Sequence, residues 1–191
     1  MLGSAAKLLI LIATTCVTHT AVAEDVISGK FDLVDHTGQS VTERSFDGKL
    51  RLVFFGFTQC PDVCPTTLLE VRRALHLLGD DGNEVQPLFI SIDPANDTQE
   101  RLAAYVAAFH PSMKGLRGSD EQTEAVAKAF NVTYGVTAAA VATSGQEEIF
   151  HTSYLFLMGR QGEFVDVFGY GTRASIIAEV IRAHLQDELS E

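Results

Sequence analysis

The chain is short of basic side chains, with 14 Lys and Arg against 25 Asp and Glu among 191 residues and a formal net charge of −11. A surface of this sign repels phosphates, which argues against a nucleic-acid partner. Hydrophobic residues make up 46% of the chain, too few for a protein that crosses a membrane many times. Repeats, low-complexity tracts and interdomain linkers are also absent after residue 23. The length therefore favours one domain with enough residues to bury a core.

Residues 1–23 have the pattern of an export signal. Lys7 is their only charged side chain, the apolar stretch "LLILIATTCV" follows it, and "AVA" at 21–23 fits a cleavage site. The strongly apolar part is shorter than the ~20 residues that a membrane span needs. We expect a cleaved signal peptide and a periplasmic domain at 24–191. An uncleaved anchor, which would tether the protein to the inner membrane, is the alternative.

Cysteine is scarce: of three, only Cys60 and Cys64 lie outside the export segment. A disulfide closing so short a loop restrains little chain, so its structural value would be small. A structural zinc site usually needs a second cysteine pair, which the sequence lacks. A redox pair and a soft-metal site both remain open, and Cu(I) accepts two or three thiolate and imidazole ligands.

The order of apolar patterns predicts an α/β fold with a thioredoxin-like layout, a mixed sheet flanked by helices and preceded by an N-terminal β-hairpin. Asp97 with Glu100, and Ser119 with Gln122, have the spacing of helix capping boxes. The expected elements are a hairpin at 29–46 with its turn at Gly38, buried strands at 50–57 and 85–93, helices at 65–79, 97–109 and 119–130, a second hairpin of 149–159 with 162–170, and a helix at 173–189.

The cysteine pair lies between an expected strand and an expected helix. Pro65 fits the first helical position and disfavours helical angles at Cys64. We therefore expect a loop that brings the two sulfurs together at a helix N-terminus. The positive partial charge there lowers thiol pKa values, which suits both redox chemistry and metal binding.

A third ligand would come from the histidines. His151 differs from the others because it begins an apolar strand pattern expected to start near the thiols. His36 fits an exposed turn, and His76, His110 and His184 lie in or beside helix patterns, where a structural role is the simpler interpretation. Other candidates with a structural alternative are Asp62 in the cysteine loop, Asp93 and Asp97 in turn or cap patterns, and the soft donors Met113 and Met158.

Three stretches, "GFTQCPDVCPTTL", "SIDPANDT" and "HTSYLFLMGRQGEFVDVFGY", closely resemble the Sco/SenC family of copper-binding, thioredoxin-fold proteins. The similarity spans roughly residues 26–185 in the same order. It implies that Cys60, Cys64 and His151 bind copper, as Cu(I) and Cu(II), and that the two cysteines can also form a disulfide. Phe57, at a position often held by tyrosine, is a mild departure, and the poorly matched stretch 136–148 leaves partner specificity open.

The resemblance also implies a metallochaperone that assembles the Cu-A centre of cytochrome c oxidase, by delivering copper or by preparing its cysteines. Expected partners are oxidase subunit II or another exported cuproprotein, and a copper-donor chaperone. We do not expect a turnover enzyme.

The main alternative is an exported thiol–disulfide oxidoreductase with Cys60 and Cys64 as its catalytic pair. The three-residue spacing, and the lack of a proline in "FHTS", argue against it. A peroxidase and a membrane-linked sensor are more distant alternatives.

Overall fold

The computed structural model describes residues 27–137 and 149–188. The expected export segment and most of the stretch 136–148 lie outside these residues. Within the described part of the chain, no helix combines the length and apolar character that a membrane span requires.

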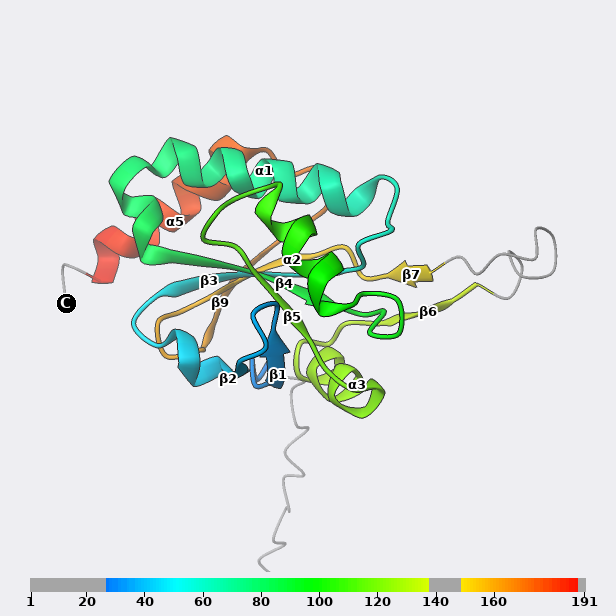
Figure 1. Ribbon diagram of the computed structural model, residues 1–191. Helices are drawn as coiled ribbons and strands as arrows, with labels where there is room; N and C mark the ends of the chain where they lie inside the picture. Colours follow the sequence, from blue (N-terminus) through cyan, green and yellow to red (C-terminus); the bar gives the residue numbers. More distant parts are fainter. Residues whose placement is uncertain (1–26, 138–148, 189–191) are drawn as a thin grey trace, which may run out of the picture.

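A seven-stranded mixed sheet forms the centre of the molecule (Figure 1). Its central strands run parallel, and both flanks are antiparallel. In spatial order the strands are β2 (Ser40–Thr42), β1 (Asp32–Asp35), β5 (Lys114–Arg117), β4 (Val85–Ser91), β3 (Leu50–Gly56), β8 (Leu155–Met158) and β9 (Phe164–Phe168).

Helices cover both faces of this sheet, as Figure 1 shows. On one face lie α1 (Val63–Leu78), α2 (Gln99–Ala107) and α5 (Ala174–Glu188), and on the other lies α3 (Asp120–Ala129). Short 3-10 helices occupy Glu43–Phe46 and Gly79–Glu84. Strand β3 is buried throughout, with Phe54 packed into one core cluster and Phe55 into the other. The predicted α/β fold is confirmed.

The predicted N-terminal hairpin is present as β1 and β2. Gly38 lies in its turn with φ of 88°, a left-handed conformation that favours glycine. The sequence patterns missed β5, which joins the hairpin to the sheet by pairing with both β1 and β4.

The apolar run 149–159 is not one strand, as the sequence suggested. Its first part, β7 (Ile149–His151), pairs with β6 (Tyr134–Val136) in a separate two-stranded sheet, and only β8 enters the main sheet. Just after β7, the backbone N–H of Thr152 donates to the carbonyl of Thr133, and this contact holds the end of β7 beside the start of β6. As a result His151 ends a strand instead of beginning one.

One of the two predicted helix caps is wrong. The N-cap of α2 is Thr98, whose hydroxyl accepts from the backbone N–H of Arg101 at 3.3 Å, whereas Asp97 is fully buried and bonded elsewhere. The predicted capping box of α3 is confirmed, because Ser119 and Gln122 bond reciprocally.

Candidate metal centre

Helix α1 begins at Val63, so Pro65 occupies the third helical position and Cys64 is helical, contrary to the sequence expectation. The first N–H groups of a helix have no acceptor within it, so a proline in this turn costs no hydrogen bond. The Cys64 N–H points instead to the Cys60 sulfur, 3.4 Å away. The loop before α1 thus folds the two sulfurs together at the helix N-terminus, as predicted.

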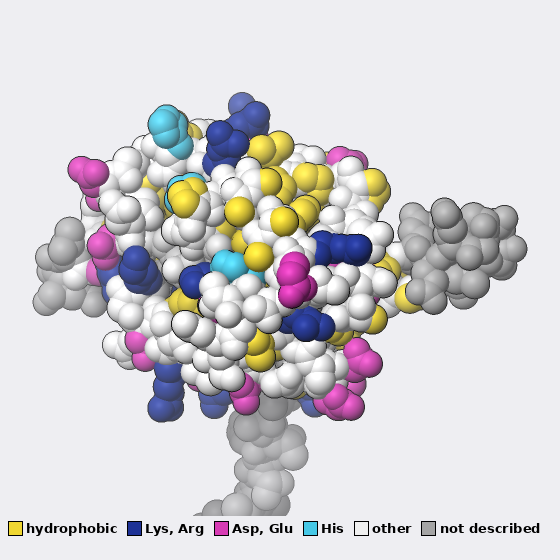
Figure 2. All heavy atoms as spheres, in the orientation of Figure 1, with side chains coloured by type: hydrophobic (Ala, Val, Ile, Leu, Met, Phe, Trp, Pro, Cys, Tyr) yellow, Lys and Arg dark blue, Asp and Glu magenta, His cyan; other side chains and the backbone are white. Residues whose placement is uncertain are grey.

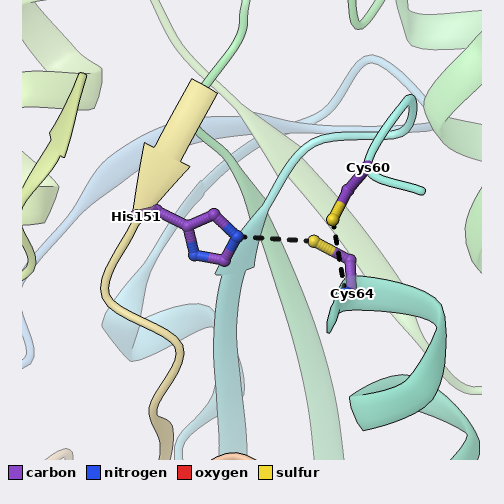
Figure 3. A group of neighbouring side chains, drawn as sticks. All are labelled: Cys60, Cys64 and His151. Atoms are coloured by element: carbon purple, nitrogen blue, oxygen red, sulfur yellow. Dashed lines mark hydrogen bonds between the residues drawn. The ribbon is translucent and has the colours of Figure 1, made fainter. Parts of the chain in front are cut away.

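His151 completes a cluster with the two cysteines (Figure 3). Its Nε2 lies 3.6 Å from the Cys64 Sγ, and the three donor atoms all lie within 4.8 Å of one another. Its Nδ1 lies 3.0 Å from the carbonyl oxygen of Thr152, which can only accept. In the neutral tautomer with its proton on Nδ1, the form that binds a metal through Nε2, the Nε2 lone pair would face the sulfurs. Phe54 and Phe57 pack edge-on against the ring, with centroids 5.9 and 6.2 Å away.

A glycine in β3 makes room for the inner thiol. Cys64 is fully buried, whereas Cys60 is only half-buried. A Cβ on Gly56 would lie 2.6 Å from the Cys64 Sγ, closer than real Cβ contacts, and 3.0 Å from the ring of Phe89, a tight contact. The absence of a side chain at this position therefore allows the Cys64 sulfur to lie directly against the strand.

The two thiols share one proton. A hydrogen bond from Cys64 lowers the pKa of Cys60 to about 4, against the effect of burial, and His151 and the N–H groups of Cys64 and Asp62 add to this. The same hydrogen bond, with burial, raises the pKa of Cys64. Near neutral pH the pair is therefore a Cys60 thiolate beside a Cys64 thiol.

Asp97 fixes the loop that leads to Cys60. Its carboxylate accepts from the Thr58 N–H at 3.1 Å, from the Thr58 hydroxyl at 2.6 Å and from the Ser91 hydroxyl at 2.6 Å. These bonds join the ends of β3 and β4. Sequence reasoning missed this role, and the available signal was the motif "SIDPANDT" itself.

The other acidic candidates lie outside the cluster of Cys60, Cys64 and His151. The Asp93 carboxylate accepts from the side-chain amide of Asn96 at 3.0 Å, within a turn. Asp62 is exposed and contributes its backbone N–H to Cys60. Among the residues described, neither carboxylate joins a metal-binding group.

The remaining soft donors and histidines are also placed elsewhere. Met113 and Met158 are buried packing residues, Met158 in the cluster on the opposite face of the sheet. His36 is half-buried and accepts from the Gly115 N–H at 3.1 Å, so the expectation of an exposed ring is wrong. His76, His110 and His184 do not belong to the cluster either.

Two sulfurs and one imidazole nitrogen form a soft donor set. With metal–donor bonds of about 2.0–2.3 Å, three donors around one ion lie about 3.5–4 Å apart. The 3.6 Å between Cys64 and His151 already matches this spacing. Copper(I) accepts such a set, whereas structural zinc usually has four protein ligands.

A family model for SCO1/SenC proteins matches residues 19–186. The chain belongs to the SCO1/SenC family. Among its relatives, the mitochondrial SCO1 homologue of Homo sapiens is 36% identical over 170 residues, which cover 86% of this chain and 55% of that protein. Protein sco1 of Schizosaccharomyces pombe is 34% identical over 159 residues, which cover 83% of this chain and 60% of that protein.

Solved SCO1/SenC structures have the same fold. Arabidopsis thaliana ScoI with copper bound is 33% identical, with a TM-score of 0.75 over 84% of this chain and 99% of that one. Bradyrhizobium japonicum ScoI with copper bound is 35% identical, with a TM-score of 0.73 over 82% of this chain and 98% of that one. The chain spans less than two thirds of the length of both curated relatives named above.

Proposed function

We propose that the protein is a copper metallochaperone that holds copper through Cys60, Cys64 and His151. The observation that carries this proposal is the convergence of these three donor atoms within 4.8 Å, in a chain whose structural relatives include copper-bound members. The Cys60 thiolate is ready to bind, and Cys64 needs to lose one proton to become the second thiolate ligand.

Delivery to the Cu-A centre of cytochrome c oxidase is the role that the family resemblance implies. Two thiolates and one imidazole leave space around Cu(I) for an incoming thiolate of the acceptor, so the ion passes by ligand exchange. The half-buried Cys60 is the more accessible of the two sulfurs and is the ligand we expect to be exchanged first. The acceptor on this proposal is oxidase subunit II or another exported cuproprotein.

A second candidate function is the reduction of an acceptor disulfide. A thiolate with a pKa of about 4 beside a protonated thiol is the arrangement of a nucleophilic and a resolving cysteine. The Cys60 thiolate would attack the acceptor disulfide and the Cys64 thiol would resolve the mixed disulfide. Two thiols here would become one disulfide, while the acceptor disulfide becomes two thiols.

We place the domain, residues 24–191, in the periplasm, because residues 1–23 have the pattern of an export signal. Relatives named as mitochondrial point to another compartment in eukaryotes.

One experiment separates delivery from thiol reduction. The copper-loaded protein is mixed anaerobically with a reduced, copper-free Cu-A domain, and the metal-free protein is mixed with the same domain in its disulfide form. His151→Ala should impair copper delivery yet retain thiol exchange, whereas Cys60→Ser should remove both. His76→Ala, an exposed imidazole on α1, is the matched control. If His151→Ala delivers copper as fast as the unchanged protein, the three-ligand proposal is wrong.

A further inference from the structure

A surface cleft of about 830 Å³ lies along the outer side of α1, separate from the cysteine–histidine cluster. Arg72 and His76 line it from α1, where their spacing of four residues places them on one side of the helix. His110, just after α2, lines it from the neighbouring element. Figure 2 shows basic side chains and a histidine at the top of the molecule, over α1.

None of the described residues that line this cleft carries a carboxylate, although the chain has 25 acidic residues. Arg73 also borders it, but its guanidinium is paired with Glu70. Across residues 27–137 and 149–188, by contrast, the Arg72 guanidinium has no ion pair or side-chain hydrogen bond. A cationic group without a carboxylate is thus left facing the cleft of a strongly acidic protein.

His110 is held in place beside this charge. Its Nδ1 lies 2.7 Å from the Ser112 hydroxyl, which fixes the ring and leaves Nε2 for another partner. Burial and then the nearby charge of Arg72 lower the pKa of His110. The positive charge of Arg72 repels the protonated form of His110. An anion bound between them would attract both groups.

We propose that the cleft binds a phosphate group. The guanidinium of Arg72 matches two phosphate oxygens, and the imidazoles of His76 and His110 can each donate one further hydrogen bond. The cleft is larger than a bare phosphate ion, and Leu69 and Leu77 on its border are 38% and 52% exposed. An organic phosphate with an apolar part therefore fits better, either a soluble ester or the headgroup of an anionic phospholipid.

The first arm of the test uses inorganic phosphate and the full chain in a nonionic detergent, at constant ionic strength. The ring signals of His76 and His110, assigned by His76→Gln and His110→Gln, should shift in NMR spectra along one saturating curve. Arg72→Gln should weaken this binding about tenfold or more, because it removes charge-assisted hydrogen bonds. Arg101→Gln, an exposed arginine on α2, is the matched control and should change the affinity less than about twofold.

The second arm distinguishes the two sources of phosphate. The same variants are sedimented with vesicles of phosphatidylcholine alone and of phosphatidylcholine with phosphatidylglycerol. Residues 1–23 could bind either bilayer, so the readout is the extra binding that the anionic lipid produces. Extra binding that Arg72→Gln removes and Arg101→Gln keeps identifies a lipid headgroup. Arg72-dependent phosphate binding without that extra binding identifies a soluble ester. The proposal is overturned if the NMR shifts rise linearly with phosphate or do not change in Arg72→Gln, and if the extra binding to anionic vesicles is absent or does not depend on Arg72.

Discussion

Substituting Gly56 by alanine should disturb the candidate copper site without touching any ligand. The added Cβ would lie 2.6 Å from the Cys64 Sγ and 3.0 Å from the Phe89 ring, and both side chains are fully buried. Since ordinary contacts are 3.4–4 Å, the sulfur has to move by about 1 Å, away from its 3.6 Å approach to His151. Overpacking of this kind costs about 1–3 kcal/mol of folding free energy.

The assay pairs denaturant unfolding of the metal-free protein with anaerobic Cu(I) competition. We expect Gly56→Ala to lower stability by that amount and to weaken Cu(I) about tenfold or more, which corresponds to about 1.4 kcal/mol. Gly169→Ala is the control, because a Cβ there meets nothing within 4 Å and its φ is not positive. A Gly56→Ala protein that matches this control in both measurements would refute the argument that close packing positions Cys64.

Three further predictions follow from buried and shared charges. Asp97→Asn should lower the free energy of unfolding by about 1–3 kcal/mol, because its hydrogen bonds lose a charged acceptor; a stability equal to the unchanged protein contradicts this. The hydrogen bond from Cys64 lowers the pKa of Cys60 to about 4, so its alkylation rate, followed by peptide mass spectrometry, should be nearly flat from pH 6 to 8 and not climb tenfold per unit. Burial raises the pKa of Asp35, but hydrogen bonds from Thr37, Gln39 and Lys114 outweigh burial and lower this pKa to about 2. The stability that this carboxylate adds is therefore complete above its unfolded value of 3.8 and is lost as pH falls towards 2, a loss that Asp35→Asn should abolish in acid unfolding curves.

Local patterns predicted those elements that local interactions determine. The capping box of Ser119 and Gln122 and the left-handed turn at Gly38 each depend on residues a few positions apart, and both are present. Local patterns could not decide which of two adjacent residues, Asp97 or Thr98, is the N-cap of α2. Thr58, 39 residues away, binds the aspartate and leaves the cap to the threonine.

Elements that depend on distant partners were the ones missed. The strand Lys114–Arg117 is short and shows no clear alternation, and its two neighbours in the sheet determine its conformation. The three candidate metal ligands were named from the sequence, but the identification of His151 needed the resemblance to a known family. No local spacing relates His151 to Cys64, from which 87 positions separate it.

The central claim is that Cys60, Cys64 and His151 form one copper site. The most direct measurement is an anaerobic Cu(I) titration of the fully reduced protein against a strong chelator, with His151→Ala, Cys60→Ser/Cys64→Ser and the control His76→Ala. We expect one tightly bound copper ion in the unchanged protein and in His76→Ala, weaker binding in His151→Ala, and none in the double serine variant. Weak binding by the unchanged reduced protein, or no effect of His151→Ala, would contradict the account and favour the thiol–disulfide alternative.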